Sequence, residues 1–298
     1  MEEGIDYKLF CKTQYSKVYF ERYTFYLRGR NSENAEKSSE RMAQHEAMLE
    51  TFQEAYEKYG DKANAAQIWN AIYDVHLKRK AKIESLTELN EAIIENIISG
   101  AQSWKKCSGH VFEEYIVRST LNRLSGYHIC LVLQKELTQM LKEGRIGNEK
   151  EDCLEDLAKS DDFDIYALID FNGMNYVFGC LQAKTSIRDR VGRDRDFSIP
   201  VMEKHFWSVA VVLDGMYLSM PKFEHMVNGG GETQYRENGW HGMYVMSNIV
   251  SNDRIYHDRD LELLIEDSKQ AAQKFISARQ RFNRYWKAIH GGGKHESI

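Results

Sequence analysis

The stretch FDIYALIDFNGMNYVFGCLQAK, residues 163–184, decides the fold. Two apolar runs, rich in β-branched and aromatic residues, flank the dipeptide Asn172-Gly173. Because Asn-Gly adopts the positive φ angles of a two-residue hairpin turn, the pattern predicts an antiparallel β-hairpin. The same pattern places Lys184 at the end of the second strand.

The residues before this hairpin predict a helical lobe. Apolar side chains recur at helical spacing over 33–59, 62–79 and 84–104, and Gly60 is placed to end the first helix. The pattern then changes at Ser108, which is placed to cap a further helix.

The residues after the hairpin complete a mixed core. Strand-like apolar runs occur at 206–218 and 242–247, and the segment 260–289 is typical of a charged amphipathic helix. Helices that alternate with strands predict an α/β core of the α+β kind, built on a mixed central sheet. We expect two domains, a helical arm over 1–105 and a catalytic domain over 106–298.

The composition limits the classes of function. The chain has 298 residues and a formal net charge of −5, so any DNA-binding cations must be concentrated in one place. No apolar run is long enough to cross a membrane, and the first residues lack the apolar core of a signal peptide. The five cysteines are scattered without a CxxC pair, which favours reduced thiols in a cytoplasm.

The two ends of the hairpin carry groups that suit metal-assisted chemistry. An acidic cluster, Asp161, Asp162 and Asp164, precedes the first strand, and Lys184 ends the second. Carboxylates hold a hard cation such as Mg²⁺, and an ammonium can position the attacking water in phosphodiester hydrolysis. Taken separately, the cluster is typical of a solvated turn and the lysine of an edge strand. The hairpin brings the acidic cluster and Lys184 together, and this favours a catalytic site over the two separate interpretations.

A dense block of charge follows the lysine. Arg188, Asp189 and Arg190 have the hydrogen-bond groups that read consecutive G·C pairs, because arginine donates to guanine and aspartate accepts from cytosine. Arg193 and Arg195 are expected to hold DNA phosphates. The alternative is an exposed helix with internal ion pairs, which four arginines against two aspartates from Arg188 to Arg195 fit poorly.

These motifs resemble the PD-(D/E)xK nucleases. KTSIRDR, residues 184–190, is similar to the type II restriction endonucleases that cut sites with a CCGG or CCNGG core. The resemblance implies a restriction-endonuclease-like fold, the cofactor Mg²⁺, a palindromic double-stranded DNA site and a homodimer, or a tetramer formed by two such dimers. It also implies that Lys184 is catalytic, that Arg188, Asp189 and Arg190 read bases, and that a cognate DNA methyltransferase acts on the same site.

The resemblance also implies the acids. In this family the second acid comes from the helix after the lysine, which points to Glu203, with Asp196 or Gln182 as alternatives. GHVFE resembles a helix motif that supplies a supporting glutamate, which points to Glu113. Asp164 is the expected first acid, and Asp164 and Glu203 are the expected metal ligands.

The register of the hairpin bears on the first acid. A two-residue turn continued without a break sets Lys184 opposite Asp161. Asp164 reaches the face of Lys184 only if a β-bulge or a longer turn shifts the register. Asp162 and Asp161 therefore stay alternatives to Asp164.

Two other functions fit the sequence. A non-catalytic DNA-binding or interaction protein would keep the basic segment and use the acidic cluster only as a loop. A repair or recombination nuclease would share the catalytic core and lack a preferred site. Loss of cleavage on Lys184→Ala separates the first alternative from a nuclease, and loss of site selection on Arg188→Ala separates the second from a restriction enzyme.

Overall fold

The structure is a computed structural model that describes residues 6–29, 32–81, 91–150, 152–160, 162–187 and 191–290. The chain forms two compact units. The first comprises Met1–Ile116 with Met246–Asn248, and the second comprises Val117–Val245 with Ile249–Ile298. The predicted domain boundary after residue 105 stays a prediction. Among the described residues, no helix is both long enough and apolar enough to cross a membrane.

The first unit is built from helices. These are α1 (Asp6–Leu27), α2 (Glu33–Tyr59), α3 (Ala65–Ala81) and the part of α4 (Glu91–Ser125) that ends at Ile116. Helix α2 begins after Ser32, whose side chain accepts a hydrogen bond from the Ala35 amide, and it ends at Gly60 as predicted. In the core of this unit, the ring of Phe52 lies 4.9 Å from the rings of both Trp69 and Tyr115.

Helix α4 corrects the prediction that a new helix starts at Ser108. The helix runs without a break through this residue, which is buried in its interior rather than at its N-terminus. Val111, Phe112 and Ile116 are fully buried at helical spacing. Packing of an apolar face supplies most of a helix's stability in proteins. The burial of these three side chains therefore outweighs the preference of serine for the N-cap position of a helix.

The second unit is organised around a mixed sheet. Its strands lie in the order β1 (Ile129–Leu133), β2 (Ile165–Phe171), β3 (Met174–Ser186), β4 (Trp207–Asp214), β5 (Gly242–Val245) and β6 (Ile255–His257). The β1–β2 and β2–β3 pairs are antiparallel, and the later pairs are parallel. The predicted mixed sheet of an α+β fold is therefore confirmed. The edge strands β1 and β6, which are short, were not predicted.

The predicted hairpin is also confirmed. Asn172 and Gly173 form its turn, with φ angles of 55° and 78°. These positive angles are those that a two-residue hairpin turn of the right twist requires.

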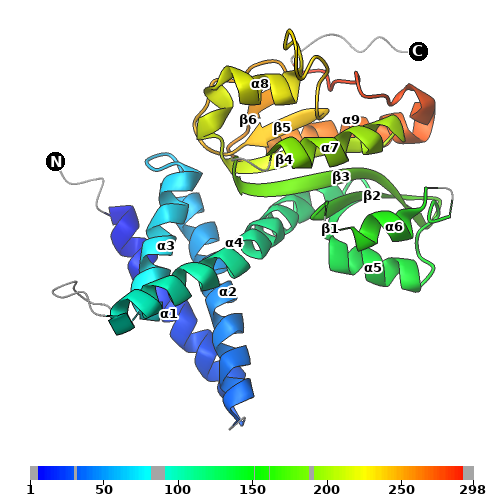
Figure 1. The fold of residues 1–298 in the computed structure, drawn as a ribbon. Helices are drawn as coiled ribbons and strands as arrows, with labels where there is room; N and C mark the ends of the chain where they lie inside the picture. Colours follow the sequence, from blue (N-terminus) through cyan, green and yellow to red (C-terminus); the bar gives the residue numbers. More distant parts are fainter. Residues whose placement is uncertain are drawn as a thin grey trace. The chain divides into compact units, whose positions relative to one another are not determined.

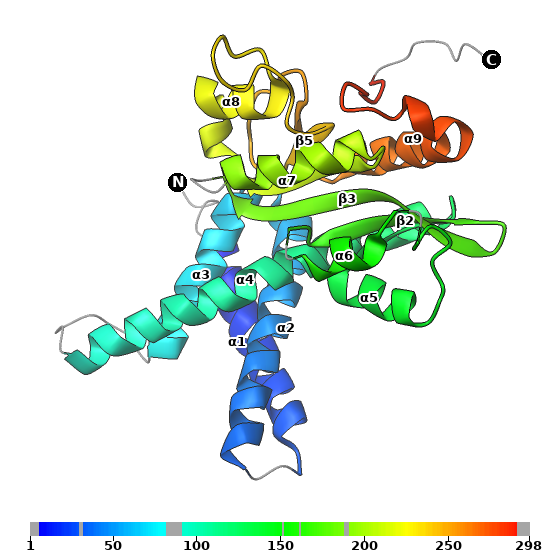
Figure 2. The same ribbon diagram turned by 45° about the vertical axis from the view of Figure 1, so that its right-hand side comes forward.

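Helices cover both faces of the sheet (Figure 1). On one face, α5 (Gln134–Lys142), α6 (Leu154–Lys159) and α7 (Val191–Glu203) enclose a core with β2 and β3. Figures 1 and 2 show α5 beside α6, and Figure 1 shows α7 beside β4. Farther along the same face, α8 (Pro221–Asn228) packs on β4 to β6. The opposite face is covered by α9 (Glu262–Ala278).

The end of the chain differs from the predicted helix over 260–289. Helix α9 ends at Ala278, and a short 3-10 turn and a non-helical segment follow. Buried polar groups bind the main chain of this segment: Arg254 donates to the carbonyl oxygens of Tyr285 and Trp286, at 3.0 and 2.7 Å. Phe282 is buried in this segment, and Tyr285 is exposed.

Candidate active site

Lys184 lies near the end of β3, where its side chain is about three-quarters buried. Its Nζ is 3.2 Å from Oδ1 of Asp194 and 4.0 Å from Oδ2 of Asp164. The structure therefore brings two carboxylates to the lysine that the sequence singled out. One of them, Asp164, was predicted, and the other was not.

Asp164 reaches Lys184 because the hairpin contains a β-bulge. From the turn, the register runs unbroken as far as the pair Leu168 and Val177. The next pair is Ala167 with Gly179, so β3 holds one extra residue, Phe178, at this point. A one-residue shift moves every side chain beyond it to the other face of the sheet.

The shift sets which acid faces the lysine. It puts Asp164 on the face of Lys184, where an unbroken register would have put Asp161, which lies outside the described residues. The Asp164 main chain donates to the Leu181 carbonyl at 3.1 Å, and its Oδ2 accepts from the Ala183 amide at 2.8 Å. Both hydrogen bonds are made with β3, so they hold the main chain and the carboxylate of Asp164 against the end of that strand.

A side chain from outside the hairpin holds the strand beside the bulge. Asn148 is almost fully buried, and it both accepts from the Val177 amide and donates to the Val177 carbonyl, at 3.0 and 2.8 Å. Its amide also donates to Asp152. β4 pairs with β3 only from Gly179 onward. At Val177, Asn148 therefore makes the main-chain hydrogen bonds that a neighbouring strand would otherwise make.

Asp194 comes from the first turn of α7. The positive end of a helix dipole stabilises a carboxylate at this position, and the helix start aims it at the end of β3. The residues predicted for this role were Glu203, with Asp196 or Gln182 as alternatives, and Asp194, ten residues after the lysine, was not among them. An acid in the first turn of the helix that follows the lysine is the signal that would have found it.

The predicted second acid, Glu203, lies at the other end of α7. Nine residues separate it from Asp194, which is roughly 13 Å along a helix axis. Its side chain is 61% exposed, and Oε1 lies 3.9 Å from Nη1 of Arg284. The structure does not bring Glu203 to Lys184, so Asp194 replaces it in the assignment that follows. The alternative Asp196 is exposed.

Glu113 lies on α4 in the first unit, where its carboxylate is 3.1 Å from Nδ1 of His110. Lys184 belongs to the second unit, so the supporting role of Glu113 stays a prediction. The expected base readers, Arg188, Asp189 and Arg190, lie outside the described residues.

The two remaining arginines of the charge block differ. Arg193 is exposed, with its guanidinium 5.3 Å from the Phe197 ring. Arg195 is partly buried and donates to the carbonyl oxygens of Met226 and Glu237, at 3.1 and 2.6 Å. Burial lowers the pKa of Arg195 from its ordinary value. Arg195 therefore ties α7 to α8 and to the loop before β5, and this leaves Arg193 as the better candidate for a phosphate contact.

This difference gives a prediction. We expect Arg195→Met to lower the free energy of unfolding by about 1–3 kcal/mol, because the hydrogen bonds from a charged donor to the Met226 and Glu237 carbonyl groups are lost. Arg193→Met should leave stability unchanged and reduce the salt dependence of DNA binding by about one phosphate contact. Urea unfolding and binding titrations at several salt concentrations measure both. Equal effects of the two variants on the salt dependence would contradict the assignment.

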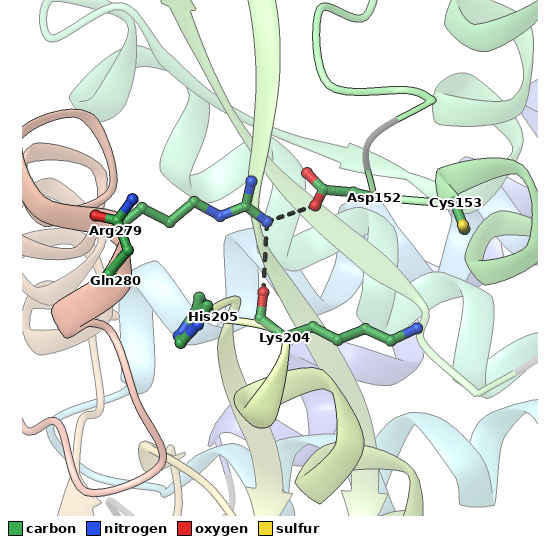
Figure 3. Close-up of a pocket in the computed structure, with 6 residues that line it drawn as sticks. All are labelled: Asp152, Cys153, Lys204, His205, Arg279 and Gln280. Carbon is green, nitrogen blue, oxygen red and sulfur yellow. Dashed lines mark hydrogen bonds and ion pairs between the residues drawn. The ribbon is translucent and has the colours of Figure 1, made fainter.

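A separate pocket lies away from Lys184. It encloses about 390 Å³ and is lined by Asp152, Cys153, Lys204, His205, Arg279 and Gln280. Figure 3 shows the Arg279 guanidinium between the Asp152 carboxylate and the Lys204 carbonyl, to which it donates at 2.6 and 3.4 Å. None of the predicted catalytic residues lines this pocket.

Comparisons with known proteins agree with the geometry. The family model of the BsaWI restriction endonuclease, type 2, matches residues 146–281. The chain is similar to restriction endonuclease BsaWI in a crystal structure of its pre-specific complex with DNA, with a sequence identity of 41% and a TM-score of 0.65. The match covers 95% of this chain and 98% of the BsaWI chain. A specific complex of AgeI with DNA is 15% identical, covers 87% and 91%, and has a TM-score of 0.52, which supports the fold alone. A search of curated proteins gave no significant match.

Proposed function

The chain belongs to the BsaWI family of type II restriction endonucleases, and we propose that its Lys184 site cuts both strands of a palindromic DNA site with the help of Mg²⁺. Sequence-specific cleavage of DNA is the activity of this family. One observation supports Lys184 as the centre of the chemistry: its ammonium contacts the carboxylates of both Asp164 and Asp194.

The carboxylates fit a divalent metal, which enzymes of this family typically need. Asp164 and Asp194 offer hard oxygen donors, and both side chains are about one-quarter exposed or less. In the described part of the chain, no group of three or more His, Cys, Asp or Glu side chains is arranged to hold a metal ion. Two carboxylates suit Mg²⁺, which keeps several of its waters when proteins bind it. When bound, the ion neutralises charge that develops on the phosphate and lowers the pKa of water.

The protein groups have separate tasks in this proposal. Asp164 and Asp194 hold the metal, and the Ala183 amide keeps Asp164 oriented through its hydrogen bond. Lys184 aligns the attacking water and offers its positive charge to the scissile phosphate.

The remaining roles follow from the resemblance and from the task. Arg188, Asp189 and Arg190 read G·C pairs of a CCGG or CCNGG-type core, Arg193 holds a phosphate, and Glu113 supports the metal site. A homodimer, alone or paired into a tetramer, matches the two-fold symmetry of a palindrome. A methyltransferase that modifies the same site would protect the host DNA. The cysteines are unpaired, which fits a reducing cytoplasm.

The proposal is tested by incubating the purified protein with phage-sized DNA and Mg²⁺ and sequencing the fragment ends. We expect discrete fragments whose ends share a palindrome with a C·G core. Discrete fragments with another shared motif would keep the nuclease and remove the assignment of the base readers. DNA that stays intact with Mg²⁺ and with Mn²⁺ would overturn the proposal.

Lys184→Ala tests the catalytic role of the lysine. We expect its cleavage rate to fall by about 10²–10⁴-fold, the range for a group that assists proton transfer or orientation at the reacting atoms. DNA binding in Ca²⁺ should persist, because the phosphate contacts remain. Lys204→Ala is the matched control, since Lys204 follows α7 at the end opposite Asp194. Equal activity of the two variants would contradict the role.

A further inference from the structure

Gln182 is a fully buried polar side chain two residues before Lys184 on β3. Alternation along a strand places both side chains on the same face of the sheet. Gln182 is one of the alternatives to Glu203 that the sequence offers, but in the structure its side chain makes three hydrogen bonds within the fold. Its Oε1 accepts from Nε1 of Trp240 at 2.8 Å, inside the core and away from solvent.

The amide nitrogen of Gln182 joins two segments of the candidate active site. Nε2 donates to the main-chain carbonyl of Asp194 at 3.0 Å and to that of Asp162 at 3.1 Å. Asp194 carries one of the carboxylates on Lys184, and Asp162 lies two residues before the other. A single side chain thus bonds to the start of α7 and to the entry of β2 at once.

The partners allow only one orientation of this amide. Main-chain carbonyls can only accept hydrogen bonds, and an indole N–H can only donate. Both hydrogens of Nε2 and one lone pair of Oε1 are therefore assigned without ambiguity. A glutamate at position 182 could accept from Trp240, but its ionised form would set a carboxylate against two carbonyl oxygens in a dry environment.

We propose that Gln182 is a positioning residue, which fixes the main chain at Asp162 and Asp194 so that the Asp164 and Asp194 carboxylates meet at Lys184. The proposal rests on the nuclease function argued above and adds a residue that acts through the acids. Gln182 does not ligate the metal. Its oxygen is committed to Trp240, and its nitrogen is committed to the two carbonyl groups.

The test compares Gln182→Met with Gln182→Glu. Methionine keeps the volume and removes all three hydrogen bonds. We expect its single-turnover cleavage rate to fall about 10–100-fold and the Mg²⁺ concentration for half-maximal rate to rise about tenfold, as happens when groups behind a metal ligand are removed. DNA binding without metal should stay within about twofold, because the phosphate contacts are unchanged.

Gln182→Glu gives a pH signature that a simple packing defect would not. Burial against carbonyl groups favours the protonated glutamic acid, which can donate one hydrogen bond. The cleavage rate of Gln182→Glu relative to Gln182→Met should therefore rise as the pH falls from 8.5 to 6. If Gln182→Glu instead cleaves at the wild-type rate with a lower Mg²⁺ requirement, position 182 is a ligand position and the proposal is wrong.

Two further variants keep the test decisive. Trp240→Phe removes the hydrogen bond that orients Oε1, together with part of a buried ring. It leaves both hydrogen bonds of Nε2 in place, and a smaller shift in Mg²⁺ requirement in the same direction is expected. Gln44→Met is the matched control, because Gln44 is a buried glutamine with side-chain hydrogen bonds in the first unit. It should lower stability and leave the Mg²⁺ requirement unchanged. If the Mg²⁺ requirement rises equally in Gln44→Met and Gln182→Met, general destabilisation explains the effect and the positioning role is wrong.

Failure of the function and failure of the positioning role give different results. If the wild-type protein does not cut DNA, the nuclease proposal fails first. If the wild-type protein cuts and Gln182→Met cuts at the same rate with the same Mg²⁺ requirement, only the positioning role fails.

Discussion

Replacing Asp194 by asparagine is expected to reduce the cleavage rate about a thousandfold, whereas replacing Glu203 by glutamine should leave it unchanged. A bound metal contributes several kcal/mol of transition-state stabilisation, and 1.36 kcal/mol corresponds to a factor of ten in rate. Asparagine keeps the size of the side chain and removes the charge that holds the cation. The rate is measured under single-turnover conditions over a range of Mg²⁺ concentrations.

The pair of variants separates the assignment made from the structure from the one made from the sequence. Asp194 contacts Lys184, and Glu203 is an exposed residue at the far end of the same helix. DNA binding in Ca²⁺ serves as the control for folding and should be retained by Glu203→Gln. If Glu203→Gln loses cleavage and Asp194→Asn does not, the acid is Glu203, and α7 must rearrange when the enzyme meets DNA.

The difference between the second acid predicted from the sequence and the one that lies beside Lys184 in the structure has a physical origin. Spacing along the sequence identifies a helix after Lys184, but it does not say where that helix starts. Because a residue's direction turns by about 100° with each step along a helix, an error of two residues exchanges one face for the opposite one. Asp194 lies in the first turn of α7, while Asp196, two residues later, is exposed.

The hairpin could be predicted because its causes are local. Asn172 and Gly173 dictate the turn, and the flanking residues dictate the strands. The bulge at Phe178 could not be predicted in the same way. Asn148, which binds the main chain beside it, lies about thirty residues earlier, and a local pattern carries no record of such a partner.

The charge block shows the same limit at Arg195. Four arginines close together favoured a DNA-facing surface, and nothing in their spacing distinguishes one that faces DNA from one that binds main-chain carbonyls. The acceptors of Arg195 are Met226 and Glu237, more than thirty residues later. Only the folded chain shows that this cation already has partners.

The second large effect is expected for substitutions of Asn148. Its side chain binds the main chain of β3 beside the bulge that sets the register of the hairpin. Asn148→Asp would bury a carboxylate in place of the amide that donates to the Asp152 carboxylate and the Val177 carbonyl. A carboxylate cannot donate to either of these acceptors. An uncompensated buried charge costs about 3–5 kcal/mol, and we expect a loss of this size in the free energy of unfolding. Urea unfolding at pH 7.5 measures it.

Asn148→Ala is the milder variant, and it tests whether the register reaches the active site. It leaves the buried amide and carbonyl of Val177 without the partner that Asn148 supplies, at a cost of about 1–3 kcal/mol for each group left unpaired. Hydrogen exchange should accelerate at the Val177 amide and also at the Ala183 amide, which donates to Asp164. The Mg²⁺ requirement for cleavage should rise with it, because Asp164 is then less firmly held.

Asn175→Ala is the matched control for this effect. Asn175 lies on the same edge of β3, two residues before Val177, and its main-chain carbonyl accepts from the Gly147 amide, a bond that the substitution leaves in place. We expect exchange at Ala183 to be unchanged in this variant. If Asn148→Ala accelerates exchange at Val177 alone and cuts DNA with the wild-type Mg²⁺ requirement, the bulge is held by the pairing of β2 and β4 with β3, and Asn148 contributes to stability without setting the position of Asp164.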